Sequence, residues 1–73
     1  MRRRSVYVVM DSERVRELRE EKGMSRRDLA GAAGISAKTV RRVELEEPVY
    51  FRTGRAVAKA LGVEPSPSLG RVL

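Results

Sequence analysis

The chain has 73 residues, of which 41% are hydrophobic and 36% charged, a balance typical of one small folded domain rather than a disordered segment. Because it contains neither cysteine nor histidine, we exclude disulfides, thiolate or imidazole metal sites, and thiol or imidazole catalysis. No apolar run approaches the ~20 residues of a membrane-spanning helix. We therefore expect a cytoplasmic protein that is not an enzyme, with no cofactor, no metal and no membrane partner.

The net charge of +6 is unevenly distributed. Residues 24–43 hold five basic residues and one acid, whereas residues 11–23 hold four basic residues and five acids. A further basic run, Arg2 to Arg4, opens the chain. A localised basic surface is typical of proteins that bind a polyanion, although charge alone leaves open a surface that merely keeps the protein in solution.

Residues 5–10 are the only segment with strand-type composition, because Val6 to Val9 are β-branched or aromatic. Two interpretations remain open for this segment. It is either a disordered leader or a strand that pairs with a second copy of itself or with the C-terminal tail, since an unpaired strand edge invites pairing.

Capping residues and glycines divide the middle of the chain into four short helices. The expected helices run from Asp11 or Ser12 to about Lys22, from the cap Ser25 to about Ala33, from the cap Ser36 to about Glu44, and from the cap Thr53 to Leu61. Gly23, Gly34 and Gly62 stand where the helices stop. Residues 46–48 form a loop, Val63 folds back onto the core, and residues 64–68 form a breaker-rich tail.

The second and third helices have apolar positions that converge on one side, at Leu29, Ala33, Ile35, Val40 and Val43. Ala30 is small enough for the two helices to cross closely, and Gly34 can turn the chain between them. The remaining positions are basic: Arg26, Arg27, Lys38, Arg41 and Arg42. A closed apolar angle with a basic rim indicates a helix-turn-helix, which places its second helix in the DNA major groove.

The chain resembles the Xre/Cro-CI family of helix-turn-helix regulators, the lambda-repressor-like domain. The resemblance covers residues 12–63 and rests on three segments in order: RELREEKGMSRRDLA (16–30), AGISAKTVRRVE (33–44) and TGRAVAKALGV (53–63). It implies an all-α fold of four to five short helices, to which a short N-terminal strand is added as a candidate dimerisation element. The expected organisation is an arm or strand over 1–10, the DNA-binding domain over 11–63 and a tail over 64–73.

The resemblance also implies roles for particular side chains. The implied base contacts are Ala37, Lys38, Arg41 and Arg42, with Arg41 also suited to a phosphate. The implied phosphate contacts are Ser25, Arg26, Arg27, Ser36, Thr39 and Arg52. Arg42 is the first choice for reading sequence, because arginine can bind guanine O6 and N7 together. The family also pairs an arginine of the first helix with the glutamate that ends the third, here Arg19 and Glu44.

The chain departs from the family pattern at three places. Glu46 stands where a glycine is usual, so the turn after the third helix is reshaped. Leu45, Val49 and Tyr50 would form an interaction patch if they were exposed together, whereas we expect Phe51 to be a core or cap residue. The usual fifth helix is replaced by the sequence PSPSLGRVL.

The favoured function is sequence-specific binding of double-stranded DNA by a dimeric transcriptional regulator, with repression favoured over activation. Residues 5–10, the C-terminal tail, or both would form the homodimer. The alternative is an antitoxin-like or other interaction module whose termini bind a partner protein, as suggested by the apolar N-terminus and by Leu69, Val72 and Leu73.

Overall fold

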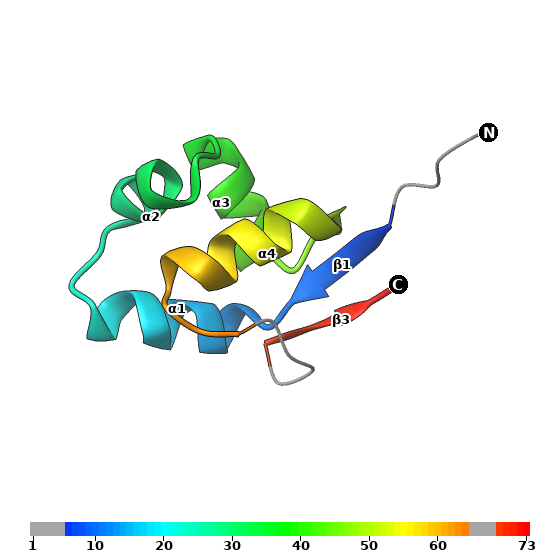
Figure 1. Ribbon diagram of the computed structural model, residues 1–73, viewed down its shortest axis with the longest axis horizontal. Coiled ribbons are helices and arrows are strands. Elements are labelled where there is room, and N and C mark those ends of the chain that lie inside the picture. Colours follow the sequence, from blue (N-terminus) through cyan, green and yellow to red (C-terminus); the bar gives the residue numbers. More distant parts are fainter. Residues whose placement is uncertain (1–5, 65–68) are drawn as a thin grey trace.

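The structure is a computed structural model that describes residues 6–64 and 69–73. It contains four helices and a small sheet, with the sheet at one end of the molecule (Figure 1). The elements in chain order are β1 (Tyr7–Met10), α1 (Ser12–Glu21), α2 (Arg26–Ala33), α3 (Ala37–Glu44), β2 (Val49–Tyr50), α4 (Phe51–Ala60) and β3 (Gly70–Val72). The expected all-α fold is therefore corrected to a mostly helical fold with a three-stranded sheet.

The first three helices begin and end where their capping residues predict, which confirms that part of the sequence interpretation. Asp11 caps α1 by accepting a hydrogen bond from the Arg14 amide. Ser25 and Asp28 form a complete capping box at the start of α2, and Ser36 caps α3. Local hydrogen bonds of this kind satisfy the amides that a helix leaves unpaired in its first turn.

The predicted start of α4 is wrong. The helix begins at Phe51, not at Gly54, and Thr53 lies inside it. Its N-cap, Tyr50, forms no side-chain capping bond, but the Phe51 amide donates to the carbonyl oxygen of Val6 at 2.8 Å. An initial amide of α4 is therefore satisfied by the neighbouring chain segment, and a threonine cap is not required.

β1 is the central strand of the sheet, whose order is β2-β1-β3 with both neighbours antiparallel. Tyr7 lies opposite Tyr50 in β2, while Val9 lies opposite Arg71 in β3. This arrangement confirms the strand interpretation of residues 5–10 over Tyr7–Met10 and its pairing with the C-terminal tail. Because both edges of β1 are occupied, this strand offers no edge to a second copy.

Two glycines allow the sheet to pack closely. A Cβ at Gly70 would lie 2.8 Å from the Val9 carbonyl oxygen, so only glycine fits this point of β3 without movement. A Cβ at Gly54 of α4 would lie 3.0 Å from Cγ2 of Val8. The missing side chain at Gly54 thus lets α4 approach the inner face of β1.

One hydrophobic core joins the helices to the sheet. The predicted residues Val15, Leu29, Val40, Val43, Val57 and Leu61 are almost completely buried, and Ala33, Ile35 and Val63 pack against the core as expected. The sheet contributes Val8, Met10 and Val49 to the core, and Leu69 just before β3 joins them. Phe51 is 41% exposed, so its predicted place in the core or cap is wrong, because its position at the α4 N-terminus directs it outward.

Some expectations concern residues outside the described part of the chain, namely Arg2 to Arg4, Ser5 and the breaker-rich positions 65–68. Over residues 6–64 and 69–73, no helix is long and apolar enough to cross a membrane. The same ranges contain no fifth helix, and β3 forms part of the segment that follows α4.

Candidate nucleic-acid interface

α2, the turn at Gly34 and α3 form the helix-turn-helix unit. Gly34 has a φ of 70°, a left-handed conformation that glycine adopts without a steric penalty. The Ile35 amide then donates to the Ala30 carbonyl oxygen at 3.0 Å, which closes the turn. Ala30 is 5% exposed, consistent with its small side chain lying at the helix crossing.

The two faces of α3 differ completely in polarity. Val40 and Val43 are fully buried, so they fix the rotation of the helix about its axis. Three cations occupy the solvent-exposed positions of the same helix: Lys38, Arg41 and Arg42. Ala37, the fourth predicted base contact, is also exposed, whereas Thr39 is half-buried. α3 therefore presents a cationic face whose orientation is set by its apolar face.

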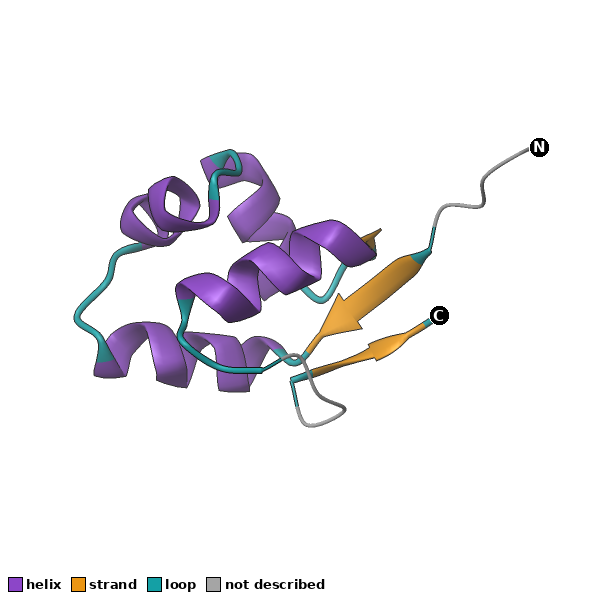
Figure 2. Ribbon diagram, viewed as in Figure 1, coloured by secondary structure: helices purple, strands orange, loops and turns teal. Residues whose placement is uncertain are grey.

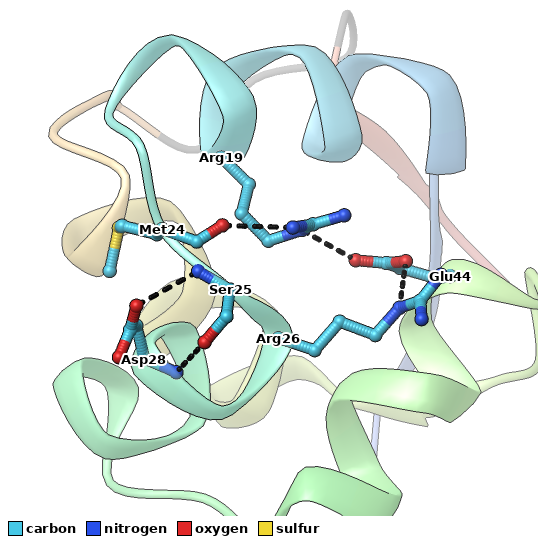
Figure 3. Close-up of polar contacts among 6 residues, drawn as sticks. All are labelled: Arg19, Met24, Ser25, Arg26, Asp28 and Glu44. Atoms are coloured by element: carbon cyan, nitrogen blue, oxygen red, sulfur yellow. Dashed lines mark hydrogen bonds and ion pairs between the residues drawn. The ribbon is translucent and has the colours of Figure 1, made fainter.

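Glu44 connects α3 to α1 and α2 (Figure 3). Its Oε2 lies 3.0 Å from Nε of Arg19, and the two side chains are only 9% and 10% exposed. Its Oε1 accepts from Nε of Arg26 at 2.7 Å. Arg19 also donates to the Met24 carbonyl oxygen at 2.8 Å, so the ion pair extends to the turn between α1 and α2.

Arg26, a predicted phosphate contact, is thus bonded to a carboxylate in this structure. Its side chain is 63% exposed, which leaves much of the guanidinium surface at solvent. The hydrogen bond from Glu44 and the negative charge of that residue raise the pKa of Arg26. Arg26 consequently stays charged and is held beside the N-terminus of α3.

Arg42, the preferred base-reading residue, is held at the C-terminal end of α3. Its Nε lies 3.4 Å from Oε1 of Glu47, and its Nη2 donates to the Pro48 carbonyl oxygen at 3.3 Å. Both side chains of the ion pair are about half-exposed, at 52% and 49%. Water and a competing anion can therefore replace this contact at small cost.

The predicted contacts at Ser25 and Ser36 have structural roles in this chain. The Ser25 hydroxyl accepts from the Asp28 amide at 3.0 Å, and Asp28 accepts from the Ser25 amide at 2.9 Å. These bonds, the backbone one first, lower the pKa of Asp28. The Ser36 hydroxyl accepts from the Thr39 amide at 3.1 Å and lies 2.9 Å from Oγ1 of Thr39.

Glu46 accounts for the loss of the family's glycine after α3. It adopts a φ of 57°, which is uncommon for a residue with a side chain. Its Oε2 accepts from the amide and the hydroxyl of Ser12, at 3.2 and 3.0 Å. The loop after α3 is thereby tied to the first turn of α1.

The structure brings Arg16 to the interface, a residue that the sequence interpretation missed. An open cleft of about 700 Å³ between α1, α2 and α3 is lined by Arg16 together with Arg26, Ala37 and Arg41. Helical spacing alone placed Arg16 on a solvent-exposed face of α1. Its proximity to α3 depends on how the helices cross, so no sequence pattern reported it.

Arg52 lies with two aromatic side chains beyond the other end of α3. Its guanidinium carbon is 4.9 Å from the ring centre of Tyr50. The Tyr50 ring in turn stacks on Tyr7, with ring centres 5.2 Å apart. The predicted patch of Leu45, Val49 and Tyr50 is not formed as expected, because Val49 is buried at 5% exposure.

Comparison with known proteins agrees with this geometry. A family described as helix-turn-helix matches residues 15–67. A protein of Archaeoglobus fulgidus named "Putative HTH-type transcriptional regulatory protein" is 38% identical over 56 residues, which are 77% of this chain and 18% of that protein. A protein of Methanocorpusculum labreanum with the same name is 51% identical over 39 residues, 53% of this chain and 12% of that protein.

The chain thus spans less than a fifth of the length of these relatives. The family match covers α2, the turn and α3, as well as most of α1 and all of α4. It therefore includes every element that orients the cationic face of α3. The chain belongs to the helix-turn-helix family of the Xre/Cro-CI type, a family of DNA-binding domains rather than enzymes.

Proposed function

We propose that this chain binds double-stranded DNA sequence-specifically, with α3 in the major groove, and acts as a dimeric transcriptional regulator that represses. The observation that carries the proposal is the division of α3 into two faces. Val40 and Val43 are fully buried, while the cations of the same helix are exposed. A rigidly oriented cationic helix is suited to base edges, because specific hydrogen bonds require fixed side-chain positions.

The proposed roles follow from position on the helix-turn-helix unit. Ala37, Lys38, Arg41 and Arg42 contact bases, with Arg41 also able to reach a phosphate. The proposed phosphate contacts are Ser25, Arg26, Arg27, Ser36, Thr39 and Arg52. Arg26 and Arg42 exchange their intramolecular carboxylate contacts for DNA, whereas the backbone amides beside the two serine caps remain where an anion can approach a helix N-terminus.

A selection experiment tests this proposal directly. Bound duplexes would be selected from a random pool, and the affinity of the enriched sequence would be measured by fluorescence anisotropy for the full chain and for Lys38→Ala and Arg42→Ala. We expect a defined half-site, and loss of discrimination at one position for each variant. Equal affinity for selected and scrambled duplexes at every salt concentration would contradict sequence-specific binding.

Dimerisation is proposed through the outer edge of β3. Both edges of β1 are paired within the chain, while Val72 and Leu73 are 60% and 63% exposed beside β3. Two-fold pairing would give two recognition helices for half-sites about 34 Å apart. A repressor role further requires that the selected half-sites overlap a promoter, and lower transcription from such a promoter when the chain is present would test it.

The alternative of an antitoxin-like or other interaction module has less support. It depended on apolar termini that would be available to a partner protein. Val8, Val9 and Met10 are buried in the sheet, and so is Leu69. Only Val72 and Leu73 keep the exposure that this alternative requires at the C-terminal end. Stable co-purification of a partner through these two residues would favour it over the proposed dimer.

A further inference from the structure

An aromatic and basic cluster lies where β1, β2 and the start of α4 meet, and the helix-turn-helix itself does not use it. We define the tyrosine cluster as Tyr7, Tyr50 and Arg52. Tyr7 and Tyr50 are 42% and 45% exposed, although both side chains are large and partly apolar. Figure 1 shows β1 running beside the N-terminal end of α4, the end that carries Arg52.

Sheet register determines the geometry of the cluster. The Val6 carbonyl accepts from the Phe51 amide, so the next pair along, Tyr7 and Tyr50, belongs to the pairs that exchange no backbone hydrogen bonds. Side chains approach most closely in such pairs. The rings accordingly stack at 5.2 Å with 26° between their planes, which fixes both side chains at low entropic cost.

Two arginines give this cluster its positive charge. Arg52 lies against the Tyr50 ring, 4.9 Å from its centre. Arg42 bonds to the carbonyl oxygen of Pro48, two residues before Tyr50. The Tyr50 hydroxyl raises the pKa of Tyr7, and the charge of Arg42 lowers it, consistent with a Tyr7 hydroxyl that is protonated at neutral pH and within range of Arg42.

We propose that the tyrosine cluster is a second DNA contact, in which Tyr7 and Tyr50 donate hydroxyl hydrogen bonds to the phosphate backbone beyond the C-terminal end of α3, beside the cation of Arg52. This inference rests on the proposed function and adds β1 to the DNA-contacting elements. Tyrosine hydroxyls are regular phosphate donors, and such contacts fix the position of a protein on the duplex. The cluster carries cations rather than acids, which favours a polyanion over an acidic protein surface.

The hydroxyl can be removed without removing the ring. Tyr7→Phe and Tyr50→Phe preserve the stack, and each should bind the selected duplex about five-fold more weakly, the range for one hydrogen bond to a charged acceptor. Because the lost group is neutral, the dependence of affinity on salt should keep its slope. Arg52→Gln should instead reduce that slope by about one phosphate's contribution.

Lys59→Gln is the matched control for Arg52→Gln. Lys59 is an exposed cation in the last turn of the same helix, at the end away from the tyrosine cluster. Its substitution should leave both affinity and salt dependence unchanged. The thermal midpoints of all four variants should match that of the original chain, so that a loss of affinity cannot be attributed to unfolding.

Tyrosine resonances provide a direct second measurement, because the chain has two tyrosines. With ring-labelled tyrosine, addition of the selected duplex should shift both sets of ring signals, and Tyr7→Phe assigns them. Unshifted ring signals, or wild-type affinity of both phenylalanine variants, would overturn the inference. If Lys38→Ala still lost discrimination in that case, the proposed function would stand without it.

Two further outcomes separate the inference from its neighbours. If the original chain bound no duplex, the proposed function would itself be wrong, and the cluster's role in DNA binding would fall with it. If the phenylalanine variants changed the sedimentation of the chain but not its DNA affinity, the cluster would be a protein contact. Either result would overturn the assignment of Tyr7 and Tyr50 to phosphate binding.

Discussion

Glu44 shows how one residue links the stability of the fold to the orientation of the DNA-contacting helix. Its two carboxylate oxygens accept from Arg19 on α1 and from Arg26 on α2, while Glu44 itself ends α3. A carboxylate shared by three helices restricts the angles between them. The same carboxylate holds Arg26 beside the N-terminus of α3, where a phosphate contact is proposed.

Glu44→Ala should lower the free energy of unfolding by about 3 kcal/mol, because it leaves the buried guanidinium of Arg19 without its partner. Urea unfolding followed by circular dichroism would measure the change. Glu47→Ala is the control, since it removes a carboxylate from the half-exposed pair with Arg42 and should change the free energy by less than about 0.5 kcal/mol. Equal losses in the two variants would contradict the buried role of Glu44.

Asp28 gives the stability of the chain a defined dependence on pH. The amide and hydroxyl of Ser25 hold its pKa below the ordinary value of 3.8, so the folded state favours the carboxylate. The resulting stabilisation is present above that ordinary value and is lost as the pH falls through the lower, folded value. The direction of the effect is therefore a loss of stability in acid.

Asp28→Asn should be less stable than the original chain at neutral pH, and the difference should shrink as the pH is lowered below about 4. Thermal unfolding at a series of pH values would measure it. Ser25→Ala removes the hydroxyl side of the same capping box and should cost about 1 kcal/mol. A difference between Asp28→Asn and the original chain that stayed constant down to low pH would argue against the carboxylate interaction.

At the scale of elements, the small sheet depends on a close approach between β3 and β1. A Cβ added at Gly70 would lie 2.8 Å from the Val9 carbonyl oxygen and 2.9 Å from the Met10 Cα. Both atoms belong to the backbone of the central strand, so a side chain at this position cannot be accommodated by rotating a neighbour. The strands must separate instead.

Gly70→Ala should therefore destabilise the chain by about 1–3 kcal/mol, the usual cost of overpacking. Gly31→Ala is the matched control, because a Cβ at Gly31 would meet nothing within 4 Å and alanine favours the helix in which it lies. Hydrogen exchange would localise the effect, with faster exchange of the Asp11 amide, which donates to Leu69, in Gly70→Ala alone. Unchanged exchange there would show that the strands tolerate the added methyl group.

The elements differ in how far the sequence could predict them, and the reason is the range of the contacts that form them. α1, α2 and α3 are bounded by caps and glycines within a few residues, so local patterns were sufficient. β2 and β3 are two and three residues long and depend on pairing with a strand far away in the sequence. The misplaced start of α4 has the same origin, since the Phe51 amide is satisfied by Val6.

The candidate site divides in the same way. Helical periodicity was sufficient to place Lys38 and Arg41 on the exposed face of α3, opposite Val40 and Val43. It could not show that Arg42 pairs with Glu47, that Arg16 shares a cleft with Arg41, or that Tyr7 stacks on Tyr50. These three contacts join elements whose relative positions follow only from the packed core.

For the molecule as a whole, the sheet separates two regions with different proposed roles. Figure 2 shows the helices on one side and the strands on the other, with β3 beside β1. The amides of Asp11 and Leu73 form backbone bonds across these two strands, to Leu69 and Tyr7 respectively. Because hydrogen-bonding direction alternates along a strand, the odd-numbered residues 69, 71 and 73 face β1, and Val72 directs its amide to the outer edge.

Val72→Pro therefore removes a donor from the outer edge while leaving the bonds between β1 and β3 intact, a substitution that edge strands tolerate. If the proposed dimer forms through this edge, sedimentation equilibrium should show a weaker dimer and a thermal midpoint close to that of Val72→Ala, which keeps the amide. The operator should then be bound with lower affinity but the same half-site sequence. Leu73→Pro provides the contrast, because it removes a donor to Tyr7 and should destabilise the sheet itself. A Val72→Pro chain that dimerises as tightly as Val72→Ala would place the dimer interface on another surface.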